Sequence, residues 1–247
     1  MSSISIMGVN INTFTKKQVL AKISDFLKGQ RQYFMVTPNP EIILEAVWRD
    51  NDFFNILNKA DLSLPDGVGL KIAAWFLGEN LPKIAGADLL KDVLDMAEKQ
   101  NRRVAVFNWQ DGLSSSSDIS LSLADKYPNL RLLALDIGRQ AIIQEDKLAR
   151  ATEFKPEIIF STFGAPYQEK FIFNNLPNFP SAKLGVGVGG GFDFLTGKSA
   201  RAPKIMRVFG MEWLWRLYKQ PSRWRRIYNA VIVFPIEFLI WRFKIKS

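Results

Sequence analysis

The sequence predicts an α/β fold: a Rossmann-like, largely parallel sheet flanked by helices, followed by a helical C-terminal appendage. Apolar runs of strand length alternate with segments of helical periodicity over residues 1–196, and this alternation is typical of parallel sheets with helices on both faces. After residue 196 the alternation ends and a segment rich in tryptophan and arginine begins. We therefore expect an α/β domain at 1–196 and a separate appendage at 197–247.

The first half of the α/β domain contains two strand-to-helix units and one further helix. The predicted strands are 32–36 and 61–64, and the predicted helices are 40–48, 68–77 and 86–100. Pro40 suits the first turn of its helix, because the N–H that proline lacks would be unpaired there. The helix at 86–100 is the clearest, because its apolar residues fall on one face. These residues are Leu89, Leu90, Val93, Leu94 and Ala97.

The second half continues the same alternation. The predicted strands are 103–107, 130–136, 157–162 and 183–188, and the predicted helices are 115–126, 144–154 and 167–176. Parallel α/β sheets bind their ligands at the carboxyl ends of the strands. Four sites along the chain should therefore meet at that edge, namely Asn39, Asp66, 164–168 and 189–194.

The residue types that the chain lacks narrow its chemistry. It contains no cysteine and no histidine, so thiolate nucleophiles and imidazole bases are excluded. Acid–base chemistry would then fall to Asp, Glu, Lys or Tyr. Asp66, in the turn Pro65-Asp66-Gly67, is a candidate general base, although aspartate in such turns often serves only as a cap. The helix that follows should favour the ionised form of its carboxyl group.

Three polar side chains near other strand ends are candidates for binding a substrate. Thr37 and Asn39 lie at a strand-to-helix junction, where they could bind a sugar hydroxyl or a phosphate or simply cap the helix. Gln168 lies four residues after Gly164. Capping does not explain its amide group, so binding and structural roles are equally favoured.

Two further motifs are weaker signals. The glycine run 185–191 contains a GxG pattern, but it lies late in the chain and TGKSARAP rather than a helix follows it, so a dinucleotide cofactor is not expected. Asp50-Asn51-Asp52 matches the DxD pattern of metal-dependent sugar-nucleotide enzymes. Because it follows a predicted helix rather than a strand, a solvated helix end is the favoured interpretation. We predict neither a metal site nor a cofactor.

The C-terminal segment has the composition of a surface-binding element. Residues 201–247 hold eleven Lys/Arg against two Glu, which equals the net charge of +9 of the whole chain, and they hold four of the seven tryptophans. Each basic residue contributes about 1 kcal/mol near an anionic leaflet, and tryptophan favours the headgroup level. The apolar run 230–241 is shorter than the ~20 residues that span a bilayer. We expect binding to an anionic membrane surface, with packing on the body and nucleic-acid binding as the alternatives.

Taken together, six sequence blocks carry a family resemblance. They are TPNPEIILEA (37–46), ADLSLPDGVGL (60–70), KIAGADLL (83–90), TFGAPYQEKFI (162–172), GVGGGFDFLTGKSARAPK (187–204) and GMEWLWRLYKQPSRWRR (210–226). In this order they resemble the WecG/TagA/CpsF family of bacterial glycosyltransferases. The resemblance implies an inverting, metal-independent enzyme without a cofactor, peripheral to the cytoplasmic face of the bacterial inner membrane. It would move a hexosyl unit from a UDP-sugar to a sugar carried on a polyprenyl diphosphate.

The resemblance also implies roles for individual residues. Asp66 would be the general base, and the side chains that would bind substrate are Thr37, Asn39, Lys83, Gln168, Arg216, Arg223 and Arg226. The three arginines would fold over the pocket and contact a diphosphate. The chain departs from the family pattern at Lys83, where arginine is usual, at Tyr167, where lysine is usual, and at 108–112, where two glycines are usual.

Two points stay open at the level of the sequence. The donor could carry N-acetylmannosamine, its uronic acid or a neutral hexose. The main functional alternative is a non-enzymatic adaptor that uses the appendage to bind a membrane or a nucleic acid. The appendage could equally pack on a second copy of the chain, so a homo-oligomer is an open possibility.

Overall fold

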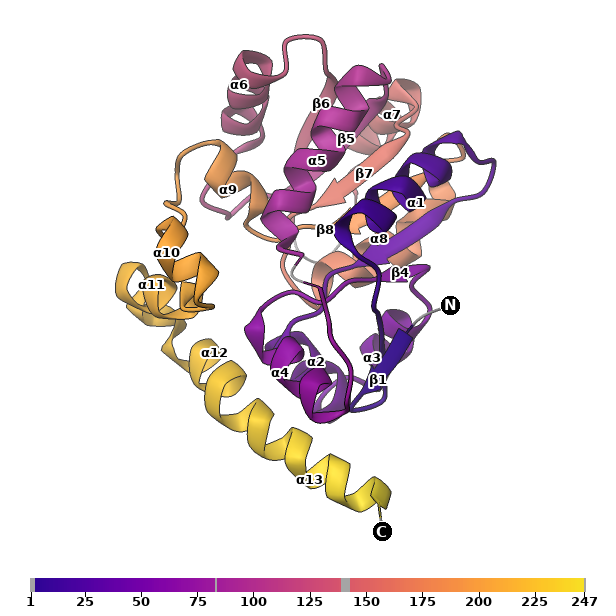
Figure 1. Ribbon diagram of the computed structural model, residues 1–247. Coiled ribbons are helices and arrows are strands. Elements are labelled where there is room, and N and C mark those ends of the chain that lie inside the picture. The colour runs from indigo at the N-terminus through magenta and orange to yellow at the C-terminus, as the bar shows by residue number, and fades with distance from the viewer. Residues whose placement is uncertain (1–2, 83, 139–142, 247) are drawn as a thin grey trace.

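The main sheet of the protein is parallel throughout. The computed structural model describes residues 3–82, 84–138 and 143–246 (Figure 1). Six strands lie in the order β4-β3-β8-β7-β5-β6, and every neighbouring pair is parallel. They are β3 (Tyr33–Val36), β4 (Leu62–Ser63), β5 (Arg103–Trp109), β6 (Arg131–Ile137), β7 (Ile158–Ser161) and β8 (Leu184–Gly187). The predicted α/β fold and all six of its strands are confirmed.

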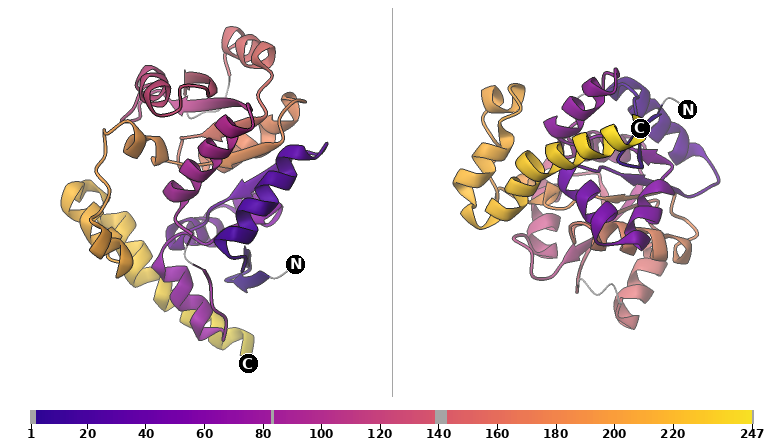
Figure 2. Two further views of the ribbon diagram at one scale, coloured as in Figure 1. Left: turned by 45° about the horizontal axis from the view of Figure 1, so that its top comes forward. Right: turned by 90° about the horizontal axis from the view of Figure 1, so that it is seen from below.

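Helices cover both faces of this sheet (Figures 1 and 2). One face packs against α1 (Lys16–Lys28), α5 (Gly86–Lys99), α6 (Ser116–Lys126) and α9 (Gly191–Leu195). The other face packs against α2 (Pro40–Trp48), α3 (Asn51–Asn58), α7 (Glu145–Phe154) and α8 (Tyr167–Asn175), and α4 (Val68–Phe76) belongs to the same core cluster. All five apolar residues predicted to share one face of α5 are buried. Ser115 forms a capping box with Asp118 at the start of α6, where the predicted helix 115–126 begins.

The structure contains elements that the sequence did not predict, namely helices α1 and α3, an N-terminal hairpin and helix α9. The chain begins with an antiparallel hairpin of β1 (Ser3–Ile6) and β2 (Val9–Asn12), which the patterns did not predict. The Asn12 side chain fixes this hairpin to the main sheet, because its Oδ1 accepts a hydrogen bond from the Ser63 N–H at 2.7 Å. Helix α9 begins inside the glycine run, where no helix was expected. Phe192 and Leu195, both buried, anchor that short helix against α5.

The appendage is helical, as predicted, and lies against the body. It comprises α10 (Lys204–Val208), α11 (Glu212–Lys219), the 3-10 turn η2 (Pro221–Arg223), α12 (Trp224–Tyr228), the π-helical turn η3 (Asn229–Val233) and α13 (Phe234–Lys246). From α12 to α13 it forms one long rod that crosses the body at the end where α4 lies, as Figure 2 shows. None of the helices in the described part of the chain has the length and hydropathy needed to cross a bilayer.

The apolar run of the appendage is partly a core element. Phe234 and Phe238 are only 1% and 2% exposed and belong to the same core cluster as α2 and α4. These two side chains therefore pack on the body, which was one of the alternatives for this segment, and do not face a lipid surface. Ile236 and Ile240 on the opposite side of α13 are exposed, so the helix has one face on the body and one apolar face outside.

Candidate active site

A pocket of about 270 Å³ lies at the carboxyl edge of the parallel sheet, between the body and the appendage. The loops that follow β3, β4, β5, β7 and β8 supply its inner wall, and α11, η2 and α12 supply its outer wall. Seven of the eight residues predicted to form the site line this pocket. They are Thr37, Asn39, Asp66, Gln168, Arg216, Arg223 and Arg226. The eighth, Lys83, lies outside the described residues.

Asp66 sits between β4 and α4, where two backbone amides hold its side chain. Its own N–H donates to the Pro38 carbonyl oxygen at 2.9 Å, which ties its turn to the loop after β3. The carboxylate accepts hydrogen bonds from the N–H groups of Gly67 and Gly86. Burial nevertheless raises the pKa of Asp66, and the guanidinium of Arg216 opposes that rise. The backbone amides at this helix start favour the ionised carboxylate, as expected, but desolvation of the carboxylate is the larger effect.

The loop after β3 both caps a helix and lines the pocket. Asn39 Oδ1 accepts a hydrogen bond from the Ile42 N–H at 3.0 Å, so Asn39 caps α2 while it also lines the pocket. The absence of a side chain at Gly86 keeps the neighbouring space open. A Cβ atom there would lie 3.7 Å from Thr37 Oγ1 and 3.9 Å from Asp66 Oδ2. Thr37, Asp66 and the N-terminus of α5 thus face one another in the pocket.

Gln168 joins two loops at the bottom of the pocket. Its Oε1 accepts hydrogen bonds from the N–H of Gly189 at 2.7 Å and from the N–H of Gly164 at 3.2 Å. Its Nε2 donates to Glu169 Oε1 at 2.7 Å. A Cβ atom at Gly187 would lie within 2.8 Å of the Gln168 amide, so that glycine is required for the amide to reach the loop after β8. The structure therefore gives this amide a structural role in addition to its place in the pocket wall.

Glu169, the residue after Gln168, was not predicted from the sequence to be a functional residue. It is 1% exposed, and burial raises the pKa of its carboxyl group to about 7. Its Oε2 has no hydrogen-bond partner in the described part of the chain. Its position on a short helix close to the apolar Phe171 and Ile172, which are both buried, could have indicated it. A buried glutamate is rare and therefore marks an unusual position.

The segment that departs from the family pattern forms a buried hydrogen-bond network. Asn108 Nδ2 donates to Asp136 Oδ1 at 2.7 Å and to the Ser114 carbonyl oxygen at 2.8 Å. Its Oδ1 accepts from Thr162 Oγ1 at 2.8 Å. Ser114 in turn donates to Asp193 Oδ1 at 2.7 Å. Asn108 thus fixes the loop after β5 to its neighbours and to the pocket wall around Asp193.

Three guanidinium groups of the appendage gather on the outer wall. The pKa of Arg223 is lowered first by burial and then by the positive charges of Arg226 and Arg216. All three guanidinium groups line the same pocket, and such a cluster of cations is a receptor for an anion. Arg226 Nε also pairs with Glu41 Oε1 at 2.6 Å, which fixes α12 to the first turn of α2. Arg216 pairs with Glu212 at 2.7 Å within α11.

Comparison with known protein families decides the class of this site. A sequence model described as the glycosyl transferase WecG/TagA/CpsF family matches residues 4–247. The chain belongs to this family. It is therefore a glycosyltransferase, and the predicted family resemblance is confirmed over nearly the whole chain.

Three relatives of the chain are each named N-acetylglucosaminyldiphosphoundecaprenol N-acetyl-beta-D-mannosaminyltransferase. The Bacillus subtilis relative is 32% identical over 77% of this chain and 73% of its own length. The Bacillus spizizenii relative is 34% identical over 82% and 77%. The relative from Staphylococcus aureus strain MRSA252 is 29% identical over 100% and 96%.

The DxD motif of this family member lies apart from the pocket. Asp50 Oδ1 accepts a hydrogen bond from the Phe53 N–H at 2.9 Å and so caps α3. Lys170 Nζ lies 2.8 Å from Asp50 Oδ2 and 3.4 Å from Asp52 Oδ2. The motif is therefore a helix end, as the sequence indicated, although it begins α3 rather than ending α2. Elsewhere in the described ranges, too, no three carboxylates gather as metal ligands would.

Proposed function

We propose that this enzyme transfers a hexosyl unit, of the N-acetylmannosamine type or a related one, from a UDP-sugar to a sugar on a polyprenyl diphosphate. The relatives' names support N-acetylglucosaminyl diphosphoundecaprenol as the acceptor. The observation that carries the proposal is the placement of Asp66 opposite three arginines in one pocket. Such a reaction belongs to the synthesis of a bacterial surface polysaccharide or wall polymer.

In the proposed reaction Asp66 removes the proton from the attacking hydroxyl of the acceptor sugar. That oxygen forms a bond to the anomeric carbon while the bond from this carbon to the phosphate oxygen breaks. The electron pair leaves with UDP, and the configuration at the anomeric carbon inverts. The raised pKa of Asp66 makes its carboxylate a better proton acceptor than an ordinary aspartate.

Stabilisation of the departing diphosphate would come from the protein itself. Arg216, Arg223 and Arg226 line the pocket, and guanidinium groups bind phosphate oxygens bidentately. Preorganised donors of this kind act where negative charge develops in the transition state. With the DxD motif paired to Lys170, we propose that transfer does not depend on a metal.

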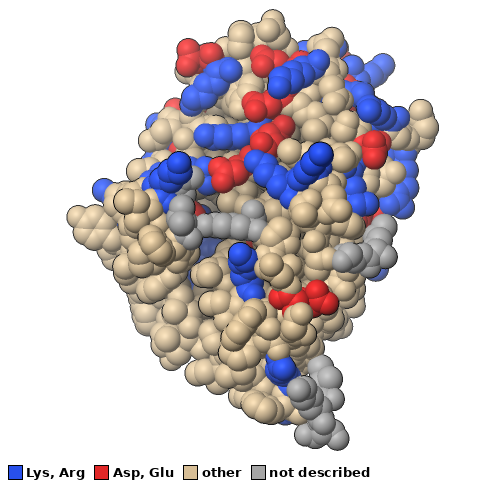
Figure 3. Space-filling view, viewed as in Figure 1, with Lys and Arg blue, Asp and Glu red and all other residues tan. Residues whose placement is uncertain are grey.

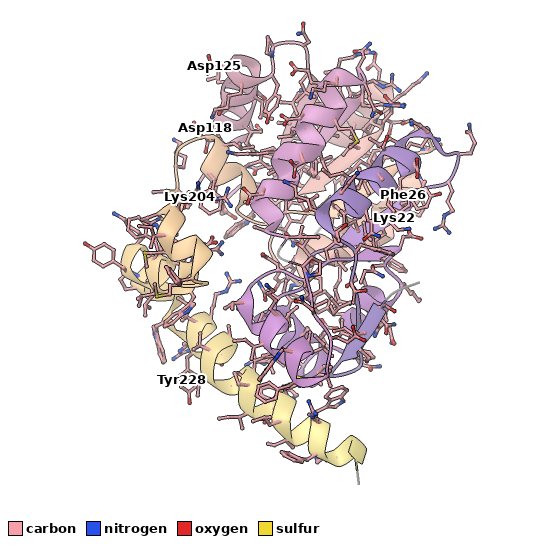
Figure 4. The ribbon with its side chains drawn as sticks, viewed as in Figure 1. Lys22, Phe26, Asp118, Asp125, Lys204 and Tyr228 are labelled. Atoms are coloured by element: carbon pink, nitrogen blue, oxygen red, sulfur yellow. The ribbon has the colours of Figure 1, made fainter. Side chains whose placement is uncertain are left out.

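The enzyme would act as a peripheral protein on an anionic membrane, at the cytoplasmic face of the bacterial inner membrane. Support comes from the exposed aromatic and apolar side chains of the appendage. The most exposed are Ile205, Phe209, Tyr218, Trp224 and Phe243. In Figure 3 charged side chains crowd the upper part of the molecule, whereas the lower part, over α4 and the appendage, is largely uncharged. Tyr228 projects from α12 on the side away from α4 (Figure 4).

A donor screen tests the proposal directly. Purified protein is incubated with a panel of UDP-sugars and N-acetylglucosaminyl diphosphoundecaprenol, and products are read by mass spectrometry with and without EDTA. We expect one added hexosyl unit from one donor class and equal rates in EDTA. Loss of the product in EDTA would contradict metal independence, and absence of any product would contradict the transferase.

A second experiment addresses the adaptor alternative. Binding to anionic vesicles and to RNA is titrated with salt. Nucleic-acid binding falls steeply because counterions compete for the phosphates, whereas membrane binding should keep an apolar component. Salt-resistant vesicle binding is the expected result.

A further inference from the structure

A second cavity, of about 460 Å³, runs between α4 and the appendage. It opens into the active-site pocket, because the two share six lining residues. These are Asn39, Asp66, Glu212, Arg216, Arg223 and Arg226. We call this second cavity the α4 groove. Any molecule that lies in it reaches the proposed base and the arginine cluster at one end.

The walls of the α4 groove are apolar on both sides. The body contributes Val68 and Ile72 from α4, and the appendage contributes Trp213, Ile227 and Val231. The turn between α10 and α11 closes tightly against α4. Gly210 there has φ +73°, and a Cβ atom on it would lie 3.0 Å from Val68 Cγ2. The two walls are thus held together by direct packing, which gives the groove a defined shape.

Charge and apolar surface are separated along the groove. Its charged lining residues other than Lys71 are those of the arginine end: Glu41, Asp66, Glu212, Arg216, Arg223 and Arg226. The remaining lining is mostly aliphatic, aromatic or proline. A ligand that fits this arrangement has an anionic head and an apolar chain. A UDP-sugar has no such chain, so the groove does not suit the donor.

We propose that the α4 groove binds the first isoprene units of the acceptor's polyprenyl chain, with the diphosphate at the arginines. This inference rests on the proposed function for the choice of acceptor. It places the polyprenyl chain against a wall to which the body contributes as well as the appendage. Ile72 and Phe76 are 52% and 43% exposed on α4, and Trp75 is 72% exposed. The remainder of a long polyprenyl chain would leave the groove past Ile72 and enter the bilayer, in which these exposed side chains would also lie.

The test measures binding, so that it does not depend on transfer. Isothermal titration compares methyl, dimethylallyl, geranyl and farnesyl diphosphate with the full-length protein in buffer without membranes. We expect Kd to fall at least tenfold from methyl to farnesyl diphosphate, which corresponds to about 1.4 kcal/mol. An equal Kd for all four ligands would overturn the proposal.

Two variants and two matched controls test whether the preference for longer chains arises in the α4 groove. Ala230 lines the groove, so Ala230→Trp should fill it and remove the preference for longer chains without changing the Kd of methyl diphosphate. Ile72→Ser should weaken the preference by making the opposite wall polar. Trp75→Ser, on α4 but outside the groove lining, and Leu121→Ser, at a 71% exposed position on α6, should keep the full preference.

The outcomes separate this inference from the proposed function. A chain-length preference that persists in Ala230→Trp, or that disappears in Trp75→Ser alone, would overturn the groove assignment. A normal preference together with no sugar transfer would leave the groove standing and remove the transferase proposal. Unchanged binding of methyl diphosphate shows in each variant that the arginine end is still folded.

Discussion

The carboxyl group of Asp66, on the body, and the guanidinium of Arg216, on α11, line the same pocket and interact electrostatically. Burial raises the pKa of the carboxyl group and the guanidinium lowers it. The two residues are far apart in the sequence and come from different structural units. The pKa of the proposed base therefore responds to two side chains of the appendage, because Arg216 lowers it and Glu212 raises it.

Replacement of Asp66 tests the proposed base. Asp66→Asn keeps the shape of the side chain but cannot accept the proton, so we expect kcat to fall about 10²- to 10⁴-fold with the thermal unfolding temperature nearly unchanged. Asp125→Asn, at an exposed position on α6 (Figure 4), is the control and should retain normal kcat. Near-normal transfer by Asp66→Asn would remove this residue from the mechanism.

The arginine cluster can be tested within a single short helical segment. Arg223 lines the pocket, whereas Arg225, two residues later, does not. Arg223→Ala should lower kcat by about 10²- to 10³-fold, the usual cost of one donor to a developing anion. Arg225→Ala removes the same charge from the appendage and should change kcat little. Equal losses in the two variants would indicate that net charge, rather than contact with the diphosphate, is what matters.

Glu169 predicts a particular dependence of stability on pH. Burial raises the pKa of its carboxyl group from 4.5 to about 7, so between these pH values the folded state binds more protons than the unfolded state. Its contribution to the free energy of unfolding is undiminished below about pH 4.5. It falls by roughly 3 kcal/mol as pH rises to about 7 and is constant above that.

The free energy of unfolding of wild type and of a Glu169 variant, measured with denaturant from pH 4.5 to pH 8, tests this contribution. Glu169→Gln can still accept the hydrogen bond from Gln168 but does not titrate, so the variant should become more stable than wild type as pH rises. Glu153→Gln, at an exposed position on α7, should follow the wild-type curve. Parallel curves for wild type and Glu169→Gln would contradict the raised pKa.

The two faces of α13 should respond differently to substitution. Phe238 is buried and Ile240 is 43% exposed. Phe238→Ala should lower the free energy of unfolding by about 3–5 kcal/mol, as large-to-small changes in a core do. Ile240→Ser should change it by less than about 0.5 kcal/mol but weaken binding to anionic vesicles. Co-sedimentation with vesicles and urea unfolding measure the two effects separately, and a reversed pattern would contradict this orientation of α13.

The main sheet was predictable because its signals are local. Runs such as 103–107 and 183–188 are strands by their own composition, and the carboxyl-edge rule then brought Asn39, Asp66 and Gln168 to one pocket. The hairpin of β1 and β2 was not predictable in this way. Its strands, SISI and VNIN, alternate apolar and polar residues and lack the continuous apolar runs by which the strands of the main sheet were recognised.

The missed parts of the site depend on contacts between distant residues. Arg226 and Glu41 are separated by 185 positions, and no local pattern reports that pair. The apolar run of the appendage has the same composition whether it faces lipid or packs on α2, so only the fold shows that Phe234 and Phe238 are buried. Glu169 was missed because its burial follows from the way α8 packs on the sheet.

The Arg226–Glu41 ion pair joins the appendage to the body. On the proposed mechanism, the body holds the base while the appendage holds the groups that help UDP depart. A UDP-sugar bound to a body with its appendage undocked would meet no electrophilic assistance, and water would be a poor nucleophile toward it. This separation of the base from the arginines would limit hydrolysis of the UDP-sugar until the acceptor is bound.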